Sequence, residues 1–276
     1  MKQQPIGIFD SGFGGLTVLR EIIKTLPQND FLYLGDNARS PYGTRSFESI
    51  YQYTLQCVQY LFEQQCPLVV LACNTASARA LRSIQQTDLP KKYPQKRVLG
   101  IIIPTAQTIG HYTKTKQIGI LATSGTVASQ SYPIEITKFF PELNVYQQAC
   151  PMWVPMVENG ELDNAGTDFF IQKYLNQLFA QCQTIDTVLL ACTHYPLLIE
   201  GIKKHLPKGV QVLSQGKIVA DSLADYLIRH PEIARECTKS KQINFLTTDD
   251  TVSFDEKGTL FFGKTIASNH LNWSLV

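Results

Sequence analysis

Two short segments in the first half of the chain return, in the same order, in the second half. The segment Ile6-Gly-Ile-Phe-Asp-Ser-Gly12 is similar to Ile118-Gly-Ile-Leu-Ala-Thr-Ser-Gly125. Further along, Leu68-Val-Val-Leu-Ala-Cys-Asn-Thr75 is similar to Thr187-Val-Leu-Leu-Ala-Cys-Thr-His194. Each segment is an apolar run followed by small or polar residues, which is typical of a buried strand and the turn after it. Two similarities in one order indicate a duplicated unit.

Apolar residues follow two patterns that alternate along the chain. Short apolar runs predict strands at residues 6–9, 31–35, 68–72, 98–103, 118–122, 143–149, 187–191 and 210–213. Stretches with apolar residues every three or four positions predict helices at residues 15–25, 46–65, 75–83, 129–139, 167–181 and 217–229. A late extended segment is expected over residues 243–262. The alternation is typical of an α/β fold with mainly parallel sheets flanked by helices.

The duplication divides the predicted fold into two pseudo-symmetric lobes. A chain of 276 residues is longer than one hydrophobic core usually requires, which favours two lobes. We expect lobe one to comprise residues 1–98 and 212–276, and lobe two to comprise residues 99–211. Because parallel sheets bind ligands beyond the carboxyl ends of their strands, we expect the active site in the cleft between the lobes.

Charge and hydropathy exclude several classes of protein. The formal net charge is only +2, and lysine and arginine form no long run, so we expect no nucleic-acid partner. No apolar run reaches the roughly 20 residues that span a bilayer. The polar start, Met1 to Pro5, has no signal-peptide pattern. We therefore expect a cytoplasmic protein that has no membrane partner.

The spacing of cysteine and histidine argues against structural disulfides and a metal site. The seven cysteines are odd in number and irregularly spaced, and a chain of this size folds without disulfides. The sequence contains no Cys-x2-Cys pair, in which two residues separate the cysteines, and its five histidines form no cluster with the spacing of metal ligands. We expect no metal, and thiol chemistry is the better reason for a cysteine to matter here.

Cys73 and Cys192 occupy the same place in the two copies, after a buried strand and before a run that can start a helix. Unpaired N–H groups and the helix dipole stabilise an anion there, which favours a thiolate. One such cysteine alone would be interpreted as a small buried apolar residue. Two cysteines at matched places favour a catalytic role. A thiolate on one face of a carbon and a thiol on the other can invert a stereocentre next to a carboxylate.

Charged side chains near the two cysteines are candidates for assistance. Asp10 caps a helix, or it accepts a substrate ammonium or polarises Cys73. His194, beside Cys192, orients or ionises that thiol, or is a capping or surface histidine. Glu158 is a further candidate, although a glutamate before Asn-Gly is often part of a solvated turn.

Neutral residues of the same segments are candidates for binding. The glycine-rich turn that contains Ser11 precedes a helix start, whose N–H groups can bind a carboxylate. The residues Pro41, Tyr42 and Gly43 predict a turn that covers a ligand. The side chains that could either bind a dicarboxylate or cap a helix are Asn74, Thr75 and Thr193.

Motifs along nearly the whole chain resemble the glutamate racemase family of the aspartate/glutamate racemase superfamily. The motifs are Asp10-Ser-Gly-x-Gly-Gly-Leu-Thr17, Pro41-Tyr-Gly-Thr44, Ala72-Cys-Asn-Thr-Ala76, Cys150-Pro-x-x-Val-Pro-x-Val-Glu158 and Cys192-Thr-His-Tyr-Pro-Leu-Leu198. The resemblance implies two pseudo-symmetric lobes, no pyridoxal phosphate, metal or nicotinamide cofactor, and frequent assembly as a homodimer. It also implies interconversion of L-glutamate and D-glutamate, which supplies D-glutamate for peptidoglycan.

The resemblance further implies roles for single residues. Cys73 would be the base for D-glutamate and Cys192 the base for L-glutamate, with assistance from Asp10, Glu158 and His194. The substrate contacts that it implies are Asp10, Ser11, Tyr42, Gly43, Asn74, Thr75, Thr193 and His194, and Pro41 lies in the same motif.

Two alternative functions fit the same residues. One is a racemase of this superfamily that acts on aspartate or hydantoin through the same pair of thiols. The other is a two-lobed protein that binds an amino acid without turnover, its cysteines being structural. Activity assays separate these functions.

Overall fold

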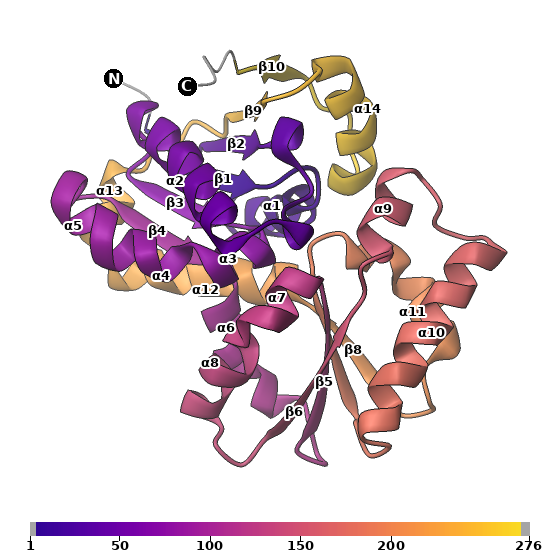
Figure 1. Ribbon diagram of the computed structural model, residues 1–276. Coiled ribbons are helices and arrows are strands. Elements are labelled where there is room, and N and C mark those ends of the chain that lie inside the picture. The colour runs from indigo at the N-terminus through magenta and orange to yellow at the C-terminus, as the bar shows by residue number, and fades with distance from the viewer. Residues whose placement is uncertain (1–3, 272–276) are drawn as a thin grey trace.

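The computed structural model describes residues 4–271, which form two parallel sheets with helices around them (Figure 1). The six-stranded sheet has the order β10-β9-β2-β1-β3-β4. Its strands are β1 (Ile6–Asp10), β2 (Phe31–Gly35), β3 (Leu68–Leu71), β4 (Arg97–Gly100), β9 (Ile243–Thr247) and β10 (Ser268–His270). The four-stranded sheet has the order β6-β5-β7-β8. Its strands are β5 (Gln117–Ala122), β6 (Asn144–Ala149), β7 (Thr187–Ala191) and β8 (Gln211–Ser214).

Helices follow most strands and cover the sheets, so the predicted α/β class is confirmed. The helices are α1 (Gly15–Thr25), α2 (Phe47–Glu63), α3 (Asn74–Arg79), α4 (Leu81–Ser83), α5 (Leu89–Lys92), α6 (Ile102–Thr108), α7 (Ser124–Ser129), α8 (Ser131–Phe139), α9 (Trp153–Glu158), α10 (Ala165–Gln181), α11 (Ile199–His205), α12 (Gln215–Arg229), α13 (Pro231–Glu236) and α14 (Thr251–Phe262). Short helical turns of other pitch are Asn37–Arg39, Tyr42–Thr44, Ile84–Asp88, Ile109–His111 and Tyr195–Leu198.

The duplicated segments form equivalent pairs of strands. The order β2-β1-β3-β4 in one sheet repeats as β6-β5-β7-β8 in the other. The register repeats as well, because Gly7 pairs with Val69 in the first sheet and Gly119 pairs with Val188 in the second. The carboxyl ends of β1 and β3 therefore correspond to those of β5 and β7, and the two cysteines lie at equivalent ends.

The predicted extended segment over residues 243–262 is wrong in its second part. Residues Ile243–Thr247 form β9, but Thr251–Phe262 form the helix α14. The side chain of Asp250 caps this helix by accepting a hydrogen bond from the N–H of Ser253. The buried residues Phe254, Gly258 and Phe261 recur at the three- and four-residue intervals of a helix. Figure 1 shows α14, in yellow, beside the sheet that also contains β1.

The predicted strand over residues 98–103 is also too long. The strand β4 ends at Gly100, and α6 begins at Ile102. A short apolar run does not distinguish a strand from the start of a buried helix. Pro104 lies in the first turn of α6, where a helix tolerates proline.

The chain passes between the sheets twice, after β4 and after β8. The helix α12, which follows β8, packs along α1, and β9 then pairs with β2 in the first sheet. The division into residues 1–98 plus 212–276 and residues 99–211 stays a prediction. Residues 1–3 of the polar N-terminal segment lie outside the described residues. In the described range, no helix has the length and hydropathy needed to cross a membrane.

Candidate active site

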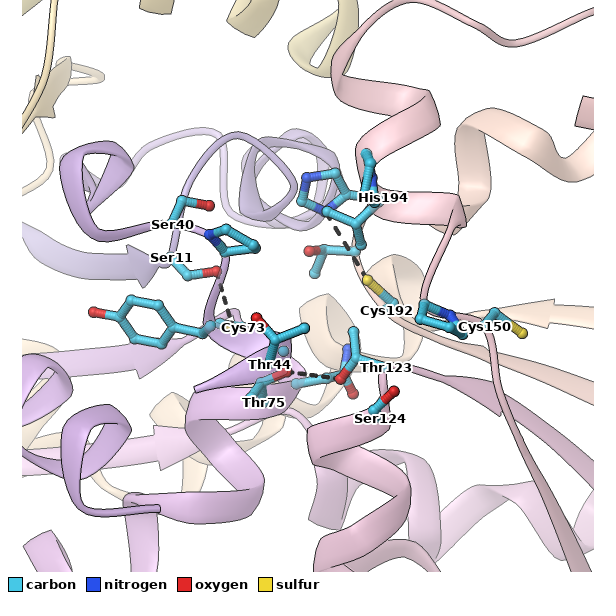
Figure 2. A pocket seen from close by; sticks show the side chains of 18 residues that line it. Ser11, Ser40, Thr44, Cys73, Thr75, Thr123, Ser124, Cys150, Cys192 and His194 are labelled. Carbon is cyan, nitrogen blue, oxygen red and sulfur yellow. Dashed lines mark hydrogen bonds between the residues drawn. The ribbon is translucent and has the colours of Figure 1, made fainter. Parts of the chain in front are cut away.

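A pocket lies at the carboxyl ends of the strands, where the two sheets face each other. Figure 2 shows Ser11 and Cys73 on one side of this pocket and Cys192 and His194 on the other. The pocket is lined by Ser11, Ser40, Pro41, Tyr42, Gly43, Thr44, Cys73, Asn74, Thr75, Thr123, Ser124, Cys150, Pro151, Val154, Pro155, Cys192, Thr193 and His194.

Cys73 follows β3 and is the N-cap of α3. Its sulfur accepts a hydrogen bond from the N–H of Ala76 at 3.4 Å, and the Ser11 hydroxyl lies 3.4 Å from it. Burial raises the pKa of Cys73 to about 12, and the nearby Asp10 carboxylate acts in the same direction. The two hydrogen bonds oppose this shift without cancelling it. The helix start favours a Cys73 thiolate, as expected, because the Ala76 N–H lowers the pKa, but burial outweighs this one backbone N–H of a six-residue helix.

Asp10 ends β1 and is fully buried beside Cys73. Its Oδ2 accepts a hydrogen bond from the N–H of Gly12 at 2.9 Å. Burial raises the pKa of Asp10, although the positive charge of His194 and the backbone N–H groups of Gly15 and Gly12 lower it. Asp10 does not contribute to the pocket lining. The structure therefore places Asp10 next to Cys73 but behind the pocket surface.

Cys192, His194 and Glu158 form a chain of contacts on the opposite side. The Cys192 sulfur lies 3.9 Å from His194 Nδ1, and His194 Nε2 lies 2.8 Å from Glu158 Oε1. Burial alone would lower the pKa of His194, but its contacts with Cys192 and Glu158 raise that pKa to about 10. At neutral pH the imidazole is therefore cationic, with a carboxylate on one nitrogen and a sulfur on the other.

The turn that contains Pro41 is held by a buried carboxylate. Asp36 is fully buried, and its Oδ2 accepts hydrogen bonds from the Arg39 guanidinium at 2.7 Å and from the Tyr42 hydroxyl at 2.5 Å. Its Oδ1 accepts a hydrogen bond from the Thr248 hydroxyl at 2.9 Å. Because the Tyr42 hydroxyl is bound to Asp36, the phenol fixes this turn and its backbone against the pocket.

Hydroxyl groups that follow strands of the two different sheets meet at the edge of the pocket. Thr75 Oγ1 lies 3.0 Å from Thr123 Oγ1 and 3.4 Å from Thr126 Oγ1. Thr123 also caps α7 by accepting a hydrogen bond from the N–H of Thr126. Figure 2 shows Thr75 and Thr123 joined by this contact. These hydroxyls and the start of α7 can donate to a carboxylate.

The start of α1 lies in close contact with the segment that follows Cys192. A Cβ on Gly14 would lie 2.2 Å from Thr193 Oγ1 and 2.5 Å from His194 Nδ1. The Thr17 hydroxyl, one turn along α1, lies 3.0 Å from the carbonyl oxygen of Thr193 and donates to it. Glycine at position 14 is therefore what allows α1 to start directly against Thr193 and His194.

Most predicted site residues line this one pocket. They are Ser11, Pro41, Tyr42, Gly43, Cys73, Asn74, Thr75, Cys192, Thr193 and His194. Asp10 and Glu158 lie behind this lining, next to Cys73 and His194 respectively.

Sequence reasoning did not select several lining residues. They are Ser40, Thr44, Thr123, Ser124, Cys150, Pro151, Val154 and Pro155. For Thr123 a signal existed, because it follows the strand of the second copy where Ser11 follows the strand of the first. Cys150, Pro151, Val154 and Pro155 fall inside a motif that carried the resemblance, yet apolar residues there gave no sign of facing a ligand.

The chain is similar to known proteins over nearly its whole length. Residues 6–223 match the Asp/Glu/hydantoin racemase family. A glutamate racemase of Geobacter metallireducens is 38% identical over 264 residues, which cover 95% of this chain and 94% of the relative. The crystal structure of a glutamate racemase isoform of Bacillus anthracis is similar with a TM-score of 0.89 and 33% identity, over 100% of both chains. The glutamate racemase of Francisella tularensis, solved in complex with D-glutamate, has a TM-score of 0.87 at 28% identity, over 99% of this chain and 98% of that one.

Proposed function

The chain belongs to the glutamate racemases of the Asp/Glu/hydantoin racemase family, and we propose that it interconverts L-glutamate and D-glutamate by moving the α-proton between Cys73 and Cys192. The observation that carries the mechanism is the pair of thiols at equivalent ends of β3 and β7, both lining one pocket. A single nucleophilic cysteine would leave the second thiol without a role.

In the proposed mechanism the two sulfur atoms start in different protonation states. The pKa of Cys73, raised to about 12, keeps that group a thiol at neutral pH. The cationic His194, whose pKa is raised to about 10, lies next to Cys192 and stabilises negative charge on that sulfur. This arrangement suits L-glutamate, for which Cys192 is the base.

Two proton transfers then complete the inversion. The proton on the α-carbon moves to Cys192, and the proton of the Cys73 thiol moves to the opposite face of the same carbon. D-glutamate and a Cys73 thiolate result, and the hydroxyl of Ser11 and the N–H of Ala76 stabilise that thiolate. The reaction of D-glutamate runs the same steps in reverse. Both steps use only the α-proton of the substrate and the proton of one thiol.

We propose that the remaining polar residues of the pocket bind the carboxylates and the ammonium group. Asn74, Thr75 and Thr193 would donate to the two carboxylates, and Ser11 would contact the substrate while its hydroxyl donates to the Cys73 sulfur. The backbone at Pro41, Tyr42 and Gly43 would cover the ligand. The negative charge of Asp10, which lies beside Cys73, would attract the substrate ammonium group. Glu158 would act on the substrate only through its contact with His194.

Assays with single enantiomers test this proposal. We expect the purified chain to racemise both enantiomers of glutamate within a panel of amino acids. Cys73→Ser and Cys192→Ser should each lower kcat by about 1,000-fold in both directions, because serine is far less acidic than cysteine. Cys182→Ser, which changes a thiol outside the pocket, should keep full activity.

Other outcomes of the same assays would contradict the proposal. Racemisation of aspartate or hydantoin in place of glutamate would move the substrate to another branch of the family. Tight binding of glutamate without turnover would indicate a binding protein. Full activity of either serine variant at position 73 or 192 would exclude the two-thiol mechanism.

The family also implies the setting in which the reaction is used. We propose that the D-glutamate supplies peptidoglycan synthesis and that the protein acts in the cytoplasm. Assembly as a homodimer is a further proposal, which sedimentation of the purified chain tests.

A further inference from the structure

A cluster of buried polar side chains lies behind Asn74, outside the pocket lining. It joins Asn74 at the start of α3, Thr105 in α6, Tyr132 in α8 and Gln215 at the start of α12. None of the four side chains exceeds 4% exposure. Thr105 and Gln215 follow the two strands after which the chain passes between the sheets, so the cluster lies at both crossings.

The orientation of the Gln215 amide is fixed by groups that can only accept from it. Its Nε2 lies 3.3 Å from the carbonyl oxygen of Ile101, which has no hydrogen to give. Its Nε2 also lies 2.8 Å from Thr105 Oγ1, and the hydroxyl hydrogen of Thr105 is already donated to that same carbonyl at 3.0 Å. Gln215 must therefore turn Nε2 toward α6 and Oε1 toward Asn74.

This orientation passes to Asn74. Gln215 Oε1 accepts a hydrogen bond from Asn74 Nδ2 at 2.8 Å, so the Asn74 amide cannot be reversed at that contact. The Tyr132 hydroxyl accepts from Gln215 Nε2 at 2.7 Å and donates to Asn74 Oδ1. Both polar atoms of Asn74 are thereby assigned by partners that lie outside the pocket.

One hydrogen of Asn74 is left for the pocket. An amide nitrogen carries two hydrogens, and within residues 4–271 Gln215 Oε1 is the acceptor that Asn74 Nδ2 has. Asn74 lines the pocket next to Cys73. In the observed orientation the second amide hydrogen has no acceptor among residues 4–271 and is available to a carboxylate, whereas the reversed amide would offer a carbonyl oxygen that repels one.

We propose that Tyr132 and Gln215 are positioning residues, which lock the Asn74 amide so that its free N–H binds a substrate carboxylate. The inference rests on the proposed function, in which the pocket binds glutamate. It predicts that loss of the Tyr132 hydroxyl weakens carboxylate binding although Tyr132 does not touch the ligand.

Binding of a dicarboxylate tests this inference. Glutarate, which lacks the amino group and cannot be racemised, serves as a competitive probe, with its inhibition constant measured beside KM for both glutamate enantiomers. We expect Tyr132→Phe to raise the inhibition constant and both KM values by about 10-fold, with a smaller change in kcat, because a hydrogen bond to a charged ligand is weakened. Tyr146→Phe is the matched control, since it removes a hydroxyl that donates to the amide oxygen of Gln117 at 3.0 Å away from the pocket.

A double-mutant cycle separates positioning from general stability. In an Asn74→Ala background, Tyr132→Phe should change the glutarate inhibition constant by less than about 2-fold, because the residue through which it acts is absent. Thermal unfolding shows whether each variant is folded. If Tyr132→Phe does not fold, Gln215→Glu carries the same test, because it keeps the shape but its ionised carboxylate has no hydrogen to donate to Thr105 or Tyr132.

The result that overturns the inference is distinct from failure of the proposed function. A folded Tyr132→Phe or Gln215→Glu variant that racemises glutamate with an unchanged inhibition constant for glutarate would overturn it. An equal effect in the Asn74→Ala background would do the same. Failure of the proposed function would instead appear as absence of glutamate racemisation in the unmodified chain.

Discussion

Replacing Gly14 by alanine adds one methyl group where the two halves of the active site meet. The backbone at Gly14 has φ −57° and ψ −38°, which any residue adopts, so alanine introduces no backbone strain. The added Cβ would lie 2.2 Å from Thr193 Oγ1 and 2.5 Å from His194 Nδ1. Both neighbours are buried, so either the start of α1 or the segment that contains Thr193 and His194 has to move.

The size of this movement follows from the contact distances. Ordinary contact begins at 3.4 Å, so Thr193 has to retreat by about 1.2 Å from its 2.2 Å separation. Displacing a catalytic group by about 1 Å can lower the rate by about 100-fold. We therefore expect Gly14→Ala to lower kcat/KM for both enantiomers by about 100-fold, or about 2.7 kcal/mol of barrier.

Steady-state racemisation with each enantiomer measures this effect, and thermal unfolding reports whether the fold is kept. Gly209→Ala is the contrasting control. Its φ of +89° strains alanine, yet nothing lies within 4 Å of the added Cβ. It should lower the midpoint of unfolding and leave kcat/KM unchanged. A folded Gly14→Ala variant with kcat/KM within about 3-fold of the unmodified chain would refute the reasoning.

Two further predictions concern charged groups. The pKa of His194, about 10, predicts that kcat/KM falls as pH rises through about 10, since the cation beside Cys192 is then lost. Glu158→Gln should move this basic limit to lower pH, because Glu158 helps to raise that pKa; an unchanged pH profile would contradict the assigned role. Asp186 accepts hydrogen bonds from Thr113, Lys114 and Thr115, which lower its pKa to about 2 despite the opposing effect of burial. The pKa is depressed in the folded state, so this stabilisation is present above about pH 4 and lost as pH falls to about 2. Asp186→Asn should lower the free energy of unfolding in urea at pH 7 by about 1 kcal/mol, a value reduced for solvent screening, with kcat unchanged; equal stability would contradict it.

The sequence predicted those parts of the site that depend on local pattern. Cys73 and Cys192 were identified because each follows a matched apolar run, and the structure places both at matched strand ends. Thr123 was not predicted although the same repeat aligns it with Ser11, because a threonine between a strand and a helix is typical of a simple N-cap, which Thr123 also is.

Other features depend on contacts that no local pattern contains. The raised pKa of Cys73 results from burial and from Asp10, which lies more than 60 residues away in sequence. The bonds of Gln215 reach Asn74, Thr105 and Tyr132, each on a different helix. The helix α14 was expected as an extended segment, because an apolar stretch alone does not separate the two structures.

The measurement that tests the two-thiol mechanism most directly is racemisation of L-glutamate in heavy water at early conversion. If two thiols hold separate protons, the new D-glutamate carries deuterium at the α-carbon, while the remaining L-glutamate keeps its original hydrogen. D-glutamate that retains the original hydrogen, or L-glutamate that gains deuterium as fast as product forms, would contradict proton transfer between Cys73 and Cys192.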